Sequence, residues 1–260
     1  MKRDTHKWAA LSAALVVLLL GSTAPSAWAQ DRDRKEVEFD EERSRPKVVP
    51  MKDARLKIEM NSTDLDVGVQ VFIDADPWTT MDIYDPSGRM IHRATNRGSL
   101  AKQGGTELFL ESGEPKLSDV PLAVFLKRFP QGDYRMVGRG IKGEKLIGIA
   151  KFTHNIPEGP VLVSPIDDAL VAPDNTVVEW EPVAAPNGSP IVGYQVLVVK
   201  PNTGITALPK IILDVMMPPT ATSMAVPPGF LLPNSTYEWE VLAIEKGGNQ
   251  TLSVGSFRTP

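Results

Sequence analysis

Ser99 and Lys102 are the pair whose spacing comes nearest to a nucleophilic centre. In the pattern S-x-x-K, the lysine amine can take the proton of the serine hydroxyl and so activate its oxygen. Such centres also need S-D-N and K-T-G elements, and the sequence holds neither of these, nor a G-x-S-x-G nucleophile elbow. Residues 99–102 are therefore expected to form a surface loop, and no catalytic residue is predicted.

Four carboxylates offer the hard oxygen ligands that Ca²⁺ prefers, namely Asp64, Asp66, Asp74 and Asp76. An EF-hand loop that began at Asp64 would need a glutamate where Ala75 stands. Solvent-facing and turn-forming carboxylates are the default interpretation, and a Ca²⁺ site between strands in the Asp64/Asp66 region is the alternative. Zinc is not expected, because the chain has no cysteine and its histidines are far apart in sequence. No metal and no cofactor is predicted.

Two further motifs indicate structure rather than chemistry. Glu179 and Glu181 are paired carboxylates of the kind that a glycosidase uses, but they flank Trp180 on a predicted strand and should face solvent. Residues 138–143 fit G-x-G-x-x-G, which binds a dinucleotide only where a helix follows. Residues 146–152 have the pattern of a strand instead, so a glycine-rich hairpin turn is predicted.

Exposed tryptophans could stack on a sugar or anchor a protein partner. Trp78 follows Asp76-Pro77 in a loop-like context, and Trp239 alternates with two glutamates. These two are the speculative partner-contact residues. Packing in a core or between domains is the favoured alternative for both, and Trp180 and Tyr194 are expected to be core residues.

Residues 1–29 have the pattern of a cleaved secretory signal. A basic start precedes an apolar stretch from Trp8 to Leu20, and small residues follow at Ala27-Trp28-Ala29. About 13 apolar residues fall short of the roughly 20 that span a bilayer, so cleavage is favoured over a signal anchor. No later segment is apolar enough to cross a membrane. We therefore expect an exported protein, periplasmic or secreted.

Charge and composition narrow the range of partners. Removal of residues 1–29 takes three basic and one acidic residue from 28 and 32, which leaves a net charge of −6. Nucleic acid is therefore not expected as a partner. Because the chain has no cysteine, its stability must come from buried apolar surface rather than disulfides.

The chain divides into a tether and two β-rich units. Residues 30–54 form a charged tether, since their charge density cannot support a core. Residues 55–155 alternate apolar and polar side chains as antiparallel strands do, with one short helix near 119–129 that Ser118 or Asp119 would cap. Residues 156–160 hold two prolines and a glycine and form the predicted hinge. Residues 156–260 contain short strands separated by Pro, Gly and Asn clusters, as a sandwich requires.

The last hundred residues resemble a fibronectin type III domain. Val178-Glu179-Trp180 is similar to its second strand, and Gly193-Tyr194-Gln195-Val196 to its third. The run from Leu231 through Pro233 and Ser235 to Tyr237 matches L-x-P-x-[ST]-x-Y, in which Tyr237 would be the tyrosine corner. The resemblance implies an immunoglobulin-like sandwich whose structural residues are Trp180, Tyr194, Leu231, Pro233 and Tyr237.

The whole mature chain also resembles uncharacterised exported bacterial proteins that join a β-rich domain to such a sandwich. Residues 62–70 and 245–251 carry this likeness. It implies no assigned activity. We therefore expect an all-β, non-catalytic binding protein whose partner is an envelope or extracellular protein. Polysaccharide binding is the first alternative, and an unrecognised hydrolase is the second.

Overall fold

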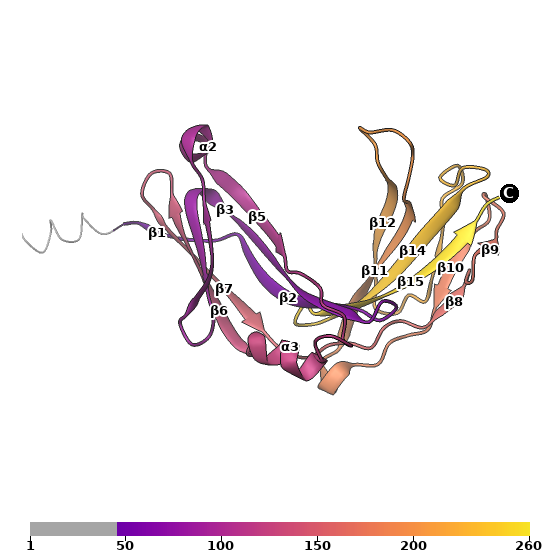
Figure 1. Cartoon of the computed structure of the whole chain (residues 1–260), viewed down its shortest axis with the longest axis horizontal. Helices are drawn as coiled ribbons and strands as arrows, with labels where there is room; N and C mark the ends of the chain where they lie inside the picture. Colours follow the sequence, from indigo (N-terminus) through magenta and orange to yellow (C-terminus); the bar gives the residue numbers. More distant parts are fainter. Residues whose placement is uncertain (1–45) are drawn as a thin grey trace, which may run out of the picture. The chain divides into compact units, whose positions relative to one another are not determined.

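The computed structural model describes residues 46–260 (Figure 1). The predicted signal peptide and residues 30–45 of the predicted tether lie outside this range. The N-terminal half has the strands β1 (Val48–Pro50), β2 (Asp53–Asn61), β3 (Asp66–Tyr84), β4 (Met90–Thr95), β5 (Gly105–Glu111), β6 (Gly132–Gly140) and β7 (Lys145–Phe152). The C-terminal half has β8 (Leu162–Ser164), β9 (Ala169–Leu170), β10 (Val177–Trp180), β11 (Ile191–Lys200), β12 (Ile211–Met217), β13 (Ser223–Ala225), β14 (Thr236–Glu245) and β15 (Gln250–Arg258).

The tether is shorter than its predicted bounds, 30–54. β1 pairs in parallel with β7, and β2 begins at Asp53, so ordered structure starts before residue 55. Pro50 is the last residue of β1, which is the edge strand of its sheet, and a proline there removes no ladder hydrogen bond. Pro46 and Pro50, which indicated a break before the first domain, thus lie before and at the end of a short strand.

β3 is one strand of 19 residues, although the sequence indicated a loop-like context at Asp76-Pro77. Its register with β5 shifts between Asp74 and Trp78, and its register with β6 shifts between Trp78 and Thr80. Such irregularities accommodate a proline, which cannot donate to the ladder, and Pro77 lies within them. The first half of β3 pairs with β2 and β5 and the second half with β4 and β6, so this strand organises the N-terminal half.

The predicted helix is present but shorter, as α3 (Leu122–Arg128). Pro121 is its N-cap residue and provides no side-chain hydrogen bond, while the hydroxyl of Ser118 donates to Asp119 instead of capping the helix. Phe125 is buried and packs against Phe129, with 5.3 Å between the ring centroids.

A second helix, α2 (Gly98–Gln103), replaces the predicted loop. α2 buries no residue, so it has no amphipathic pattern that the sequence could reveal.

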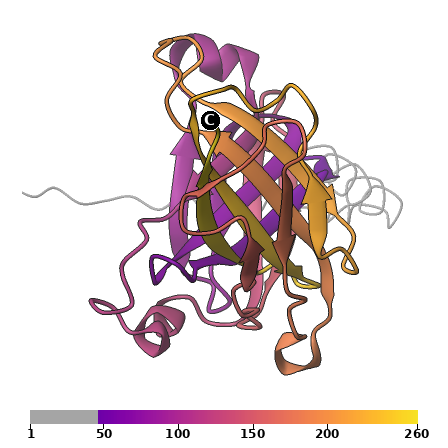
Figure 2. The same ribbon diagram turned by 90° about the vertical axis from the view of Figure 1, so that its right-hand side faces the viewer.

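The C-terminal half is a sandwich of the predicted kind (Figures 1 and 2). One sheet has the order β13-β10-β8, and the strands β12-β11-β14-β15 form the opposing layer. Trp180 lies buried in the core and packs on Tyr194, with 5.5 Å between ring centroids. The backbone N–H of Leu232 donates to the Tyr237 hydroxyl at 2.7 Å, which is the predicted tyrosine corner. The predicted all-β fold with an immunoglobulin-like sandwich is confirmed.

Residues 46–260 form one compact unit that contains two hydrophobic cores. The first core is built from residues 56–152 and the second from residues 178–257, so the predicted hinge falls between them. A single sheet nevertheless runs through both halves, because β15 pairs in parallel with β2, with Gln250 opposite Glu59 and Leu252 opposite Asn61. At this junction, β2 of the N-terminal half and β15 of the C-terminal half are therefore paired with each other.

Gly159 in the predicted hinge lies against the β2–β3 turn. A Cβ atom at this position would lie 2.5 Å from the Cβ of Ser62. The Ser62 hydroxyl donates a hydrogen bond to the carbonyl of Leu252 at 2.9 Å. We expect Gly159→Ala to lower the free energy of unfolding by about 2 kcal/mol, because the hinge must move away from the turn. Urea unfolding measures the loss. Gly113→Ala is the control, since a Cβ atom there meets nothing within 4 Å, and an equal loss in both variants would contradict the argument.

Candidate functional site

The two tryptophans named as speculative partner contacts are buried, in agreement with the favoured alternative of packing in a core. Trp78 is 3% exposed and lies in the first core, and Trp239 is 0% exposed and lies in the second. The irregularity at Pro77 turns Trp78 inward, and Gly105 of β5 leaves space for its ring, since a Cβ atom there would lie 2.9 Å from Trp78 Cζ2. Trp239 Nε1 donates to the carbonyl of Pro165 at 2.8 Å. Neither ring can stack on a ligand.

The other sequence motifs are dispersed over the fold. Ser99 and Lys102 lie on α2, and Glu179 and Glu181 are exposed at the end of β10. The glycine-rich segment forms the predicted turn between β6 and β7, in which Gly143 has a φ of 90° that favours glycine. The dinucleotide fingerprint is therefore a hairpin, as expected.

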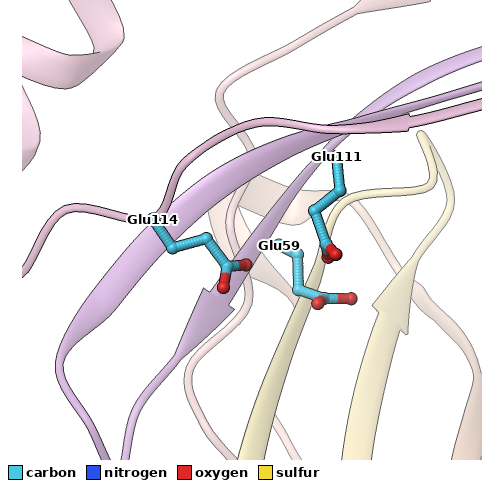
Figure 3. A group of neighbouring side chains, drawn as sticks. All are labelled: Glu59, Glu111 and Glu114. Atoms are coloured by element: carbon cyan, nitrogen blue, oxygen red, sulfur yellow. The ribbon is translucent and has the colours of Figure 1, made fainter.

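The four aspartates do not gather at one point. Asp64 accepts a hydrogen bond from the side-chain amide of Asn61 at 3.1 Å in the β2–β3 turn, and Asp74 forms an ion pair with Lys52 at 3.2 Å. Within residues 46–260, the acidic group that does gather consists of Glu59, Glu111 and Glu114 (Figure 3). One carboxylate oxygen from each lies within 4.8 Å of the others.

This acidic group is placed by sheet pairing between distant strands. Glu59 is on β2, Glu111 ends β5, and Glu114 follows β5 in the next loop. The side-chain amide of Gln70 donates to Glu111 at 2.8 Å, and that of Gln250 donates to Glu59. Burial raises the pKa of Glu59, although Gln250 and Lys57 oppose the shift. No local pattern in the sequence indicates this group, because β2 and β5 are brought together only through their shared neighbour β3.

The acidic group can weaken the fold through mutual repulsion. Burial raises the pKa of Glu114 above its ordinary value of 4.5, and the carboxylates of Glu111, Asp66 and Glu59 raise it further. A carboxyl with a raised folded pKa contributes stability that is full below pH 4.5 and is lost as pH rises through the folded pKa. Three carboxylates alone define no metal site, and Ca²⁺ binding stays a prediction that calorimetric titration can test.

Glu114→Gln is therefore expected to stabilise the protein at pH 7 and to have no effect at pH 4. Because Glu114 is largely exposed, the gain is about 0.3 kcal/mol, and salt should reduce it. Urea unfolding at both pH values and at low and high salt measures the difference. Glu107→Gln, at an exposed position of β5, is the control. A stabilisation that is equal at the two pH values would contradict the electrostatic origin.

The turn between β14 and β15 is occupied by intramolecular contacts. Asn249 is 1% exposed, and its side-chain oxygen accepts from the backbone N–H of Ile58 at 2.8 Å. Its side-chain amide donates to the carbonyls of Thr153 and Asn155 at 3.0 and 3.1 Å. Glu245 is 0% exposed and accepts from the hydroxyl of Ser189 at 2.5 Å. This turn therefore joins the two halves, and its polar groups are not available to a partner.

The strand β12 is one of the two end strands of the long sheet, and β1 is the other. β12 is the last strand in the order that ends β14-β11-β12, and its register with β11 is regular from Met217 to Ile211. Ile212 and Met216 are 51% and 64% exposed. An edge strand presents unpaired backbone N–H and C=O groups. β12 holds one charged residue, Asp214, and no lysine, proline or bulge. β12 is the candidate interaction site.

None of the helices in the part of the chain that the structure describes has the length and apolar character needed to cross a membrane.

Comparisons with known proteins add a distant structural likeness. A scan against protein-family models found no match, and neither did a comparison with curated proteins. Among the solved structures, the crystal structure of the FN1-FN3 domains of chicken CNTN1 is similar at 12% identity and a TM-score of 0.31. The alignment covers 82% of this chain and 65% of that chain, so this chain spans just under two thirds of its length. The fold assignment rests on the strand order and the tyrosine corner described above.

Proposed function

We propose that this chain is an exported, non-catalytic binding module whose partner is an envelope or extracellular protein. The observation that carries the proposal is the unprotected edge strand β12 with its exposed apolar side chains. An extended segment of the partner would add to β12 as a further strand, with backbone hydrogen bonds giving affinity and side-chain contacts giving specificity. The signal-like residues 1–29 support export.

The exposed residues near β12 favour a protein segment as its occupant. Ile212 and Met216 lie on one face of the strand, and Ile205 and Leu208, both exposed, lie in the loop before it. Asp214, between the first two, is already engaged because the side-chain amide of Gln195 donates to both of its oxygens at 3.0 Å. The exposed side chains of β12 that have no such partner are therefore apolar, as a sheet-extending protein segment requires.

The two alternatives have less support. Stacking of a polysaccharide on Trp78 or Trp239 needs exposed rings, and both rings are buried. A hydrolase needs a nucleophile or a pair of carboxylates in a pocket, whereas Ser99 lies on the short surface helix α2 and Glu179 is exposed on β10. All-β sandwiches of this type are typically non-catalytic, which agrees with a binding role.

Met216→Lys tests the proposal. We expect a loss of partner binding of at least about tenfold, because a charged side chain on an edge strand opposes strand addition. The stability should change by less than about 0.5 kcal/mol, since Met216 is 64% exposed. The partner is first obtained with a photo-crosslinking amino acid at Ile212 in cells of the native host, and affinity is then measured with the purified partner.

Ile149→Lys is the matched control, because Ile149 is 59% exposed on β7, a strand of the N-terminal half. Hydrogen exchange gives the second measurement, since strand addition should slow exchange of the β12 amides only when the partner is bound. Equal loss of binding in both variants, or unchanged exchange in β12, would rule out this edge as the binding site.

A further inference from the structure

A pocket of about 390 Å³ lies where the N-terminal strands β2 and β7 approach β11, β12 and the β14–β15 turn. Its volume is within the range of roughly 300–1,000 Å³ that is typical of small-ligand sites. Three of the side chains that line it are cationic, and they come from two separate strands: Arg55, Lys57 and Lys151. No carboxylate is among the residues that line it.

Two of these three cations form no direct ion pair within the described residues. Arg55 pairs with Asp53 at 2.9 Å and stacks over the Phe72 ring at 4.6 Å from its centroid. Neither Lys57 nor Lys151 forms an ion pair of 4 Å or less with another residue of the range 46–260. The lining is therefore cationic, although the Glu59 carboxylate outside it partly offsets the charge of Lys57.

Lys57 is held in place by one neutral acceptor. Its ammonium group donates to the side-chain oxygen of Gln250 at 2.8 Å, which leaves two of its three N–H donors for another partner. Burial lowers the pKa of Lys57, and Arg55 lowers it further, against the opposing effect of Glu59 and Glu111. An anion in the pocket would offset this cost, because it would pair with a partly desolvated charge.

The rest of the lining suits a hydroxylated ring. Ala54, Ala150 and Ile244 supply apolar contact surface, and Gln195 supplies an amide whose nitrogen is fixed by Asp214. The Gln195 side-chain oxygen has no hydrogen-bond partner among the contacts of residues 46–260 and can accept from a hydroxyl. A carboxylate would reach the lysines while the apolar side chains cover one face of the ring.

We propose that this pocket binds a sugar acid, with the carboxylate held by Lys57 and Lys151 and the ring held by Gln195 and Ile244. The site uses charge and not aromatic stacking, so it is independent of the buried tryptophans. The pocket shares Met216 with the edge strand β12, so variants at Lys57 and Lys151, which lie outside β12, separate its binding from strand addition.

Binding of three small probes to the chain lacking residues 1–29 tests the assignment by calorimetry. Glucuronate has both the ring and the carboxylate, glucose has the ring alone, and acetate has the carboxylate alone. We expect glucuronate to bind at least about tenfold more tightly than either fragment, which is the discrimination that one charge-assisted hydrogen bond supplies. Equal binding of glucose would overturn the role of the cations, and equal binding of acetate would overturn the role of the ring. Absence of glucuronate binding at millimolar concentration would overturn the site.

Variants locate the binding. Lys57→Met and Lys151→Met should each weaken glucuronate binding about tenfold or more, since each removes a charge and keeps the apolar stem. Lys145→Met is the matched control, because Lys145 is an exposed lysine of the same strand β7 outside this pocket. Unfolding midpoints verify that the variants fold. Equal weakening in the control would overturn the pocket as the site.

Discussion

Replacing Trp78 by alanine is expected to lower the free energy of unfolding by about 4 kcal/mol, as is typical of truncating a large buried aromatic side chain. Trp78 is 3% exposed and lies at the register shift of β3, where Gly105 provides the space for its ring. The alanine variant leaves a cavity in the first core that the neighbouring strands cannot close without losing their pairing. Urea unfolding followed by circular dichroism measures the loss.

Two further variants show that the loss comes from burial. Trp78→Phe should cost about 1 kcal/mol, because it keeps most of the ring and removes an N–H that has no hydrogen-bond partner in the described chain. Phe109→Ala, at a 61% exposed aromatic residue of the neighbouring strand β5, should change stability by less than about 0.5 kcal/mol. Full stability of Trp78→Ala together with a loss of carbohydrate binding would contradict the burial argument and would support a ligand contact by Trp78.

Replacing Asn249 by alanine is expected to lower the free energy of unfolding by about 3 kcal/mol, because several buried polar groups lose their partners together. The variant leaves the backbone N–H of Ile58 and the carbonyls of Thr153 and Asn155 without the hydrogen bonds that Asn249 makes. Because these groups belong to the N-terminal half, the loss also weakens the connection between the two cores. Urea unfolding of the whole chain measures it.

Asn249→Asp separates hydrogen bonding from side-chain volume. A carboxylate can accept from Ile58 N–H but cannot donate to the two carbonyls, and it buries a charge, so we expect a loss at least as large as in the alanine variant. Asn175→Ala is the control at an exposed asparagine with no side-chain hydrogen bond of its own in the described chain. An effect of Asn249→Ala below about 0.5 kcal/mol would show that the turn does not hold the halves together.

The C-terminal strands could be predicted from the sequence because their signal is local. The strands predicted at 177–180, 191–199, 211–215, 223–226, 237–244 and 251–257 agree within two residues at each end with β10, β11, β12, β13, β14 and β15. These strands alternate inner and outer residues, with apolar residues on the inner face, and prolines, glycines and asparagines separate them. Trp180, Tyr194 and Tyr237 could be placed in the core for the same reason, since their neighbours fix which face they occupy.

The errors occur where a local signal has two meanings. Asp76-Pro77 indicated a loop, yet a proline is also accommodated where a strand changes its register, and this turned Trp78 from surface to core. Pro46 and Pro50 indicated the end of the tether, yet Pro50 ends an edge strand. The sequence alone cannot decide between a loop and an irregular or edge strand, because the neighbouring strand in the sheet decides it.

The sequence by itself determined the fold class, the sandwich strands and the lack of a recognised catalytic motif, because these depend on residue types and short spacings. Only the tertiary structure decided which surfaces remain free. The Glu59 group, the cationic pocket at Lys57 and Lys151, the junction at Asn249 and the free edge of β12 all depend on pairing between distant segments. Such pairing follows from the packing of the complete chain and leaves no periodicity in the sequence from which it could be predicted.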